Sequence, residues 1–299
     1  PMGAYGKVAG ESLGEYKNNP DEYMAKTPCQ RAKIIFLGPL LNYILGFLCF
    51  WLIFFVGYPS LTTEVGGLVE GLGAKDAGIQ AGDNFIAVDG RRVDFWDDLL
   101  KITEDKKEAT NVVLLVLRDN KEYNVEVKIK EKQLDDAMGS KRKVGLLGIM
   151  PKDEWIKVKH GIGKSFILGM RKTWELTVLT YKGLWRIITG KLSIRESVTG
   201  PLGVFYITSK VVNLGMIAVL HLLAVLNVSL CIFNLLPLPV LDGGNIVLLG
   251  IEKIRGRPIS LKIDRVITQI GFTAIISLAV IATYNDLLKD GKYDPTNPQ

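Results

Sequence analysis

Apolar residues dominate three windows of the chain that contain no Asp, Glu, Lys or Arg. The windows cover residues 34–57, 211–241 and 266–285. Because a helix rises 1.5 Å per residue, about 20 apolar residues cross the hydrocarbon core of a bilayer. One such window could be a buried core helix, but three in one chain indicate a membrane protein. We therefore predict membrane-spanning helices at 34–57, at 266–285 and within 211–250.

Residues 64–150, between the first two windows, follow the patterns of a small β-rich domain. Asp89-Gly90 between two apolar runs favours a type I′ hairpin turn. Apolar and polar residues alternate from Tyr123 to Lys130, as in a half-buried strand. The expected elements are a hairpin at residues 85–93, a short helix at 94–103, strands at 112–117 and 123–130, and a closing strand at 144–149.

Residues 71–93 of this domain closely resemble a PDZ domain of the bacterial protease type. The matching stretch reads GLGAKDAGIQAGDNFIAVDGRRV. The resemblance implies that a peptide ligand could add as an extra strand beside the closing strand. The groove residues would be Gly145, Leu146, Leu147 and Gly148. The domain could instead be a spacer that binds nothing, or a gate that excludes large substrates.

An amphipathic helix is predicted at residues 164–190. Apolar and aromatic side chains recur there every three or four residues, from Ile167 through Trp174 to Ile188, and Lys and Arg occupy much of the remainder. This composition suits a helix that lies on the membrane surface. A helix packed on the outside domain is the alternative.

The distribution of Lys and Arg predicts which segments of the chain lie on each side of the membrane. The chain has 37 Lys and Arg against 31 Asp and Glu, a net charge of +6. Basic residues concentrate before the first span, at residues 1–33, and in the loop 251–265, so both segments should be cytosolic. The domain at 64–150 and the tail 286–299 then lie outside. Since charge is used for topology and no RNA-binding pattern is visible, nucleic-acid binding is not expected.

The candidate chemistry lies in the stretch Asn234-Leu-Leu-Pro237-Leu-Pro239-Val-Leu-Asp242-Gly-Gly. Two prolines one residue apart interrupt a helix and free backbone carbonyls. Such unwound backbone is tolerated in a bilayer only where protein or a wet cavity surrounds it. Asp242 is therefore a candidate functional carboxylate. Alternatively, it only caps a helix that starts near Asn245.

Asn-x-x-Pro-x-Pro-x-Leu-Asp-Gly resembles the signature of the site-2 protease family, zinc peptidases that cut within membranes. Three other stretches are similar to the bacterial RseP-type branch, in the same order along the chain. They are PMGAYGKVAGE at residues 1–11, KTPCQRA with GPLLN at residues 26–42, and TGPLGV at residues 199–204.

The resemblance implies a multi-pass α-helical membrane protein with an inserted α+β PDZ domain, a Zn²⁺ cofactor, and Asp242 as one zinc ligand. It implies that Asn234 steadies the substrate backbone or the oxyanion, and that the segment between the prolines stays open. Single-pass membrane proteins such as anti-sigma factors, or remnant signal peptides, would be the substrates, in the bacterial cytoplasmic membrane with the site toward the cytosol. The implied substrate-binding residues are Tyr5, Gly6, Lys7, Val8, Asn42, Pro237 and Pro239.

The sequence departs from the family at Ala4 and Gly6, which replace the more usual Gly and Val of the first matching stretch, and above all in its histidines. It has two histidines, His160 and His221, and no His-Glu-x-x-His motif, which in the family supplies two zinc ligands and the general base. We expect this motif on a fourth span that precedes Pro1 in the full protein. A catalytically inactive PDZ adaptor that binds peptides, or a transporter-like scaffold, are the alternative functions.

Overall fold

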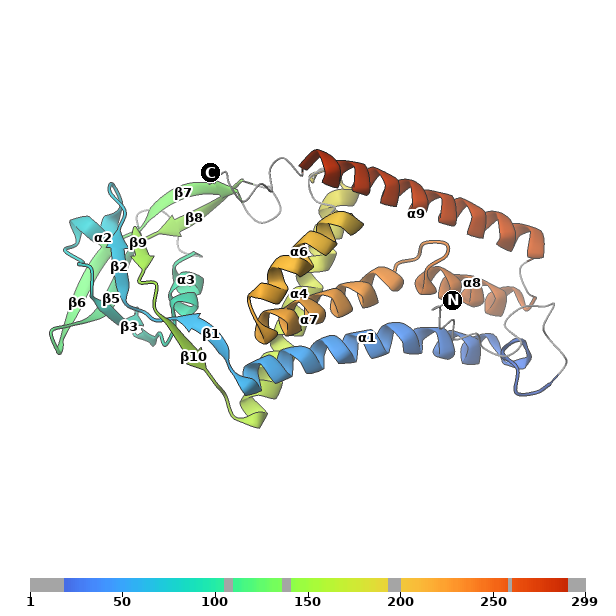
Figure 1. Ribbon diagram of the computed structural model, residues 1–299, viewed down its shortest axis with the longest axis horizontal. Helices are drawn as coiled ribbons and strands as arrows, with labels where there is room; N and C mark the ends of the chain where they lie inside the picture. Colours follow the sequence, from blue (N-terminus) through green and yellow to red (C-terminus); the bar gives the residue numbers. More distant parts are fainter. Residues whose placement is uncertain (1–18, 105–109, 136–140, 193–199, 258–259, 290–299) are drawn as a thin grey trace. The chain divides into compact units, whose positions relative to one another are not determined.

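The computed structural model describes residues 19–104, 110–135, 141–192, 200–257 and 260–289. The chain divides into two compact units (Figure 1). One unit is Phe54–Ile162, and the other combines Pro1–Ile53 with Gly163–Gln299.

Within the described residues, three helices are long and apolar enough to cross a membrane. They are α1 (Pro28–Val56), α7 (Met216–Asn234) and the part Arg265–Leu287 of α9 (Leu261–Lys289). Their presence confirms the prediction of a multi-pass helical protein. α1 begins six residues before the apolar window because Thr27 and Gln30 form a capping box. The Thr27 N–H donates to Gln30 Oε1 at 3.0 Å, and the Gln30 N–H donates to Thr27 Oγ1 at 3.4 Å.

The second apolar window is divided among several elements. α6 (Pro201–Asn213) ends just before Gly215, whose φ of +96° is a conformation that glycine adopts without strain, and α7 starts at the next residue. α7 ends at Asn234, and a non-helical segment leads to α8 (Asp242–Arg255). The stretch 211–250 therefore contains one spanning helix flanked by parts of two others.

α1 packs against its neighbours through small residues. A Cβ built at Gly46 would lie 2.6 Å from Val228 Cγ2 of α7. On the other helix, α4 (Ile162–Ile188), a Cβ built at Gly169 would lie 3.0 Å from the backbone nitrogen of Trp51. In lipid no hydrophobic driving force brings helices together, so close van der Waals packing at small residues stabilises their association instead.

The buried face of α4 is made of small residues at four-residue spacing: Ser165, Gly169, Thr173 and Thr177. The Thr177 hydroxyl lies 3.0 Å from the Tyr43 hydroxyl of α1, a hydrogen bond between the two helices. The apolar residues of the predicted stripe, including Ile167, Trp174 and Trp185, are exposed. The amphipathic pattern therefore marks a face of α4 that points away from α1, which suits contact with lipid, and a membrane-surface position stays a prediction.

The end of α9 supplies a cap for α6. The buried Asp286 carboxylate accepts hydrogen bonds from the Gly200 N–H at 3.1 Å and from the Gly203 N–H at 2.8 Å. These donors belong to the first turn of α6, where backbone N–H groups have no partner within the helix and where negative charge is favoured. A Cβ at Gly200 would lie 2.6 Å from Asp286 Oδ2, so the contact requires a glycine there.

The unit Phe54–Ile162 is a PDZ-like β region, as predicted. Its central sheet has the antiparallel order β4-β3-β5-β6, and three strand pairs, β1–β10, β2–β9 and β7–β8, complete it. The elements are β1 (Tyr58–Leu61), β2 (Val65–Leu68), α2 (Gly73–Asp76), β3 (Asn84–Val88), β4 (Arg91–Arg92), α3 (Trp96–Glu104), β5 (Asn111–Arg118), β6 (Lys121–Lys128), β7 (Lys130–Asp135), β8 (Lys141–Leu146), β9 (Ile149–Pro151) and β10 (Trp155–Val158).

Two hairpin turns follow the sequence pattern. Asp89 and Gly90 both have positive φ, 48° and 75°, and join β3 to β4 with a two-residue loop. Asp119 and Asn120 do the same between β5 and β6, with φ of 49° and 60°. Positive φ at both central residues is the mark of a type I′ turn, whose twist matches that of the strands. The buried hydrophobic core of this unit includes Phe85, Leu99, Leu114 and Val127.

The expected closing strand at residues 144–149 is interrupted. β8 ends at Leu146, Gly148 has a φ of +89°, and β9 begins at Ile149 and pairs with β2 instead. Gly148 is also in close contact with Leu72, since a Cβ built on it would lie 2.3 Å from the Leu72 Cβ. Glycine at this point lets the chain change its pairing partner.

An ion pair with a buried carboxylate and a half-buried guanidinium joins the loop before β3 to β5. Asp83, 1% exposed, accepts bonds from Arg118 Nε at 2.6 Å and from Arg118 Nη2 at 2.7 Å, and one from the Gln80 N–H at 2.8 Å. Burial alone would raise the pKa of the Asp83 carboxyl, but the bonds from Arg118 and Gln80 outweigh it and lower that pKa below its usual value.

We predict that Asp83→Asn destabilises this unit by about 3 kcal/mol at pH 7, because it leaves Arg118 without its buried partner. Since the folded pKa lies below the unfolded value of about 3.9, the stabilisation is present above about pH 4 and is lost as pH falls through the folded pKa. Hydrogen exchange of β3 and β5 amides in the full protein, corrected for intrinsic rates, measures both effects. Asp94→Asn, in the exposed pair with Arg92, is the matched control and should change stability by less than about 1 kcal/mol. Equal effects of the two substitutions would contradict the prediction.

Candidate metal centre

The chain between α7 and α8 is unwound. The Leu236 N–H donates a hydrogen bond to the Phe233 carbonyl at 3.1 Å. The Leu238 N–H then donates to the Leu236 carbonyl at 2.7 Å, which closes a tight turn. Pro237 and Pro239 have no N–H to donate, so a helix cannot continue through them. Val240 has a φ of +78°, a strained conformation for a β-branched residue. Backbone strain of this kind persists only where the surrounding structure holds it in place.

The surrounding glycines hold the unwound segment tightly. A Cβ built at Gly243 would lie 2.3 Å from the Leu235 carbonyl oxygen, and one at Gly244 would lie 2.1 Å from the Leu238 carbonyl oxygen. On α9, a Cβ at Gly271 would lie 2.6 Å from the Pro239 Cβ. The segment is thus pressed against both the start of α8 and the side of α9.

Asp242 is the first residue of α8. The N-cap is Leu241, in an extended conformation, and no side-chain bond caps the helix. The alternative in which Asp242 caps a helix starting near Asn245 is therefore wrong, because the helix already includes residue 242. The Asp242 side chain is half-buried, and no hydrogen bond or ion pair reaches its carboxylate from the part of the chain that the structure describes.

α1 passes beside this carboxylate. A Cβ built at Gly38 would lie 4.0 Å from Asp242 Oδ2. Asn42 follows Gly38 by one helical turn, so the two residues share a face of α1. The structure therefore places the predicted substrate residue Asn42 on the face of α1 that approaches Asp242.

The other predicted residues are distributed as follows. Asn234 is the last residue of α7, half-buried, eight positions before Asp242. The segment Tyr5, Gly6, Lys7 and Val8 lies outside the described residues. In the PDZ-like unit, Leu147 is part of the core, its carbonyl accepts the Ala74 N–H at 2.8 Å, and the Gly148 carbonyl accepts the Val69 N–H at 2.8 Å. The remaining groove candidates, Gly145 and Leu146, are the last residues of β8.

The described residues around Asp242 provide only part of the ligands that a metal site needs. A half-buried carboxylate without a partner can give a metal one oxygen ligand. No cluster of three or more His, Cys, Asp or Glu occurs among the described residues. His221 packs edge-on against Phe50, with ring centroids 5.5 Å apart, as expected for a histidine within the helical bundle.

Sequence reasoning missed four residues of this region: Gly38, Gly271, Arg31 and Glu252. The first two are small residues within apolar helices, a composition that often marks helix contacts in membranes. Arg31 and Glu252 form an ion pair between α1 and α8. They are 221 residues apart in sequence, and no local pattern relates them.

Taken together, these features define a multi-pass membrane protein with a PDZ-like β region and a carboxylate at the start of α8, directly after an unwound segment. The chain belongs to peptidase family M50, whose model matches residues 1–278.

Its relatives over most of the chain include RasP-type zinc metalloproteases. The zinc metalloprotease RasP of Bacillus licheniformis is 31% identical over 89% of this chain, and the regulator of sigma-W protease RasP of Bacillus subtilis is 28% identical over 89%. The chain spans 61% of the length of each of these relatives.

Among solved structures, the PDZ domain of an SdrC-like protein from Listeria innocua is 21% identical and covers 31% of this chain and 96% of its own, with a TM-score of 0.25. The corresponding domain from Listeria monocytogenes is 19% identical and covers 31% of this chain and 87% of its own, with a TM-score of 0.24.

Proposed function

We propose that this protein is an intramembrane zinc metalloendopeptidase of the site-2 protease type. The observation that carries the proposal is the half-buried Asp242 carboxylate, free of described partners and placed where the chain unwinds beside α1. A catalytic zinc takes three protein ligands and keeps one position open, and we propose Asp242 as one of the three. When bound, zinc makes water a nucleophile at neutral pH and polarises the carbonyl under attack.

The chain's own residues would bind and orient the substrate. Pro237 and Pro239 keep the segment after α7 non-helical, and Pro237 and Leu238 are exposed there, so a substrate segment could pack against them. The Asn234 amide would donate to a substrate carbonyl or to the oxyanion that develops from it. Asn42 contributes a second amide from α1, and Tyr5 to Val8 would pair with the unwound substrate as an added strand.

The proposed substrates are single membrane-spanning segments, such as those of anti-sigma factors or remnant signal peptides. A helix hides its peptide bonds in its own hydrogen bonds, so cleavage requires local unwinding of the substrate. The positive-inside rule puts the basic loop after α8 in the cytosol of a bacterial cell and the site near the cytosolic face of its membrane. The PDZ-like unit would lie outside, where it binds peptide ends near Gly145 to Gly148 or excludes substrates that still carry a large domain.

The test uses the full-length protein, as its gene encodes it, in proteoliposomes with a tagged single-span substrate. We expect cleavage inside the span, located by mass spectrometry, that 1,10-phenanthroline stops and that added zinc restores. The same substrate with its span replaced by a soluble linker is the control and should stay intact. Binding of the substrate without any cleavage would favour the peptide-binding adaptor instead.

A further inference from the structure

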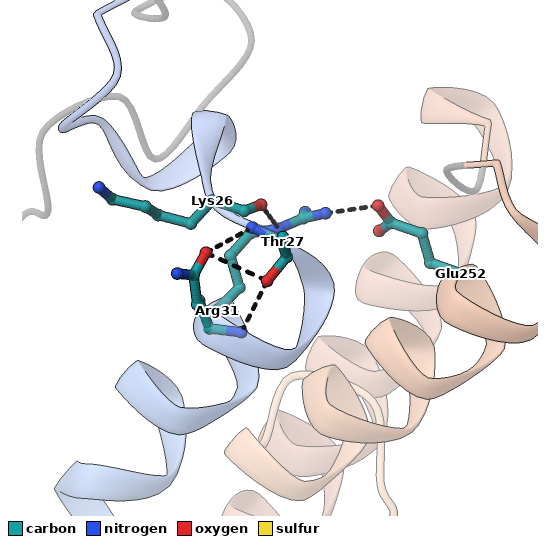
Figure 2. A network of polar contacts seen from close by, with 5 residues as sticks. Lys26, Thr27, Arg31 and Glu252 are labelled. Atoms are coloured by element: carbon teal, nitrogen blue, oxygen red, sulfur yellow. Dashed lines mark hydrogen bonds and ion pairs between the residues drawn. The ribbon is translucent and has the colours of Figure 1, made fainter.

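A buried ion pair joins the two helices that meet at Asp242. Arg31, in the first turn of α1, donates from Nη2 to Glu252 Oε1 near the end of α8 (Figure 2). Their side chains are only 11% and 16% exposed. Surface ion pairs contribute little, but a pair withdrawn from water is costly to break because one charge is left without compensation.

The Arg31 side chain is held by more than its partner. Its Nε donates to the Lys26 carbonyl at 3.2 Å, and its guanidinium lies 5.9 Å from the centre of the Tyr23 ring. The capping box of Thr27 and Gln30 fixes the backbone of the same turn. The guanidinium is therefore oriented before it meets Glu252, so the ion pair gives α8 a defined position against α1.

The ion pair and the candidate ligand lie on the same two helices. Glu252 is ten residues after Asp242, about 15 Å along α8, and Gly38 is seven residues after Arg31, about 10 Å along α1. The helices approach each other at both levels, Arg31 with Glu252 and Gly38 with Asp242. Since α8 is a continuous helix, a shift at Glu252 moves the Asp242 carboxylate relative to α1.

The chain before α8 packs on the start of that helix at Gly243 and Gly244, but it does not join α8 to α7 as a continuous helix. The segment from Leu235 to Leu241 is unwound, so α7 does not transmit its orientation to α8 as a continuous helix would. Gly271 fastens the segment to α9, not to α1. The directed polar contact between α1 and α8 that the structure describes is the one from Arg31.

We propose that Arg31 and Glu252 are positioning residues, which hold the Asp242 carboxylate in register with the face of α1 that carries Gly38 and Asn42. This inference rests on the proposed function, because it assigns the pair a role in forming the metal site.

The test compares Glu252→Gln and Arg31→Gln with the exchanged pair Arg31→Glu with Glu252→Arg, all in the full-length protein. Glu175→Gln is the matched control, since Arg171 and Glu175 form an exposed pair within α4, with side chains 70% and 46% exposed. We expect each single variant to bind zinc about 10-fold or more weakly in chelator competition. The cleavage kcat should fall by about 10-fold to 100-fold with KM nearly unchanged. The exchanged pair should recover part of both losses, and the control should match the wild type.

A second readout needs no metal. Spin labels on cysteines introduced at the exposed positions Lys33 and Ile254, in a protein whose native cysteines are replaced, report the distance between α1 and α8. Glu252→Gln should broaden this distance distribution in metal-free protein, and Glu175→Gln should not.

Wild-type zinc affinity and kcat in Glu252→Gln, or an unchanged label distance, would overturn the positioning role. Equal losses in the control would do the same, as they would indicate a general loss of stability. A wild-type protein that binds no zinc would instead overturn the proposed function and this role of the pair with it.

Discussion

Asp242→Ala will abolish zinc-dependent cleavage in the full-length protein and leave membrane insertion intact. The carboxylate has no described hydrogen bond or ion pair, so its removal breaks no contact that holds the fold. Loss of an outer-sphere partner of a metal already costs 10-fold to 100-fold in affinity or activity, and we expect loss of a ligand to cost more than about 100-fold. Zinc content after dialysis and the rate of substrate cleavage measure the effect.

Asn245→Ala is the control for this substitution. Asn245 is exposed and lies in the first turn of α8, so the variant removes a polar side chain of similar size from the same turn. It should retain zinc and activity within about twofold, since surface substitutions change stability by only about 0.5 kcal/mol. Full activity of Asp242→Ala would rule out Asp242 as a ligand.

Gly244→Ala will damage the same site through the backbone. Its Cβ would lie 2.1 Å from the Leu238 carbonyl oxygen, a contact that no side-chain rotation relieves. Overpacking of this kind costs about 3 kcal/mol or more, because the unwound segment must move away from α8. We expect a lower unfolding temperature in detergent, together with loss of most zinc binding and cleavage.

Gly250→Ala provides the comparison. Gly250 is exposed in the same helix, and a Cβ there would meet nothing within 4 Å. Alanine is the better helix former, so this variant should be as stable as the wild type or more stable by up to about 1 kcal/mol. If both alanine variants behaved alike, the close packing between Gly244 and Leu238 would have no part in forming the site.

Much of the fold could be predicted from local patterns. Apolar windows without charge identified the spanning helices, because the bilayer core tolerates few charges along 20 residues. Asp89-Gly90 marked a hairpin because both residues accept positive φ. The break in the closing strand was missed because Leu147 and Gly148 continue the apolar run, and only the pairing of β9 with β2 shows where it divides.

The face of α4 shows a different limit of such patterns. The apolar periodicity from Ile167 to Trp185 indicated which residues share a face, but not what that face contacts. In water the apolar face would be the buried one, whereas beside lipid the small residues pack on protein. Serine, glycine and threonine at positions 165, 169, 173 and 177 were the available signal, and they form the face that contacts α1.

At the candidate site, the sequence indicated the proline pair and Asp242 because proline and aspartate are unusual within an apolar helix. The contacts that hold them are tertiary. Gly271 meets Pro239 from another helix, and Arg31 meets Glu252 across 221 residues. Helix packing decides such contacts, so a pattern within a short window does not contain them.

The carboxylate of Asp286 has a consequence for biosynthesis. The N–H groups of Gly200 and Gly203 receive their acceptor from a residue synthesised 86 and 83 positions later. During translation, therefore, the start of α6 stays without this partner until nearly all of α9 has left the ribosome. A nascent chain halted before residue 286, or a gene truncated there, leaves those amides to water or lipid headgroups, so the start of α6 gains its acceptor only once the end of α9 has been made.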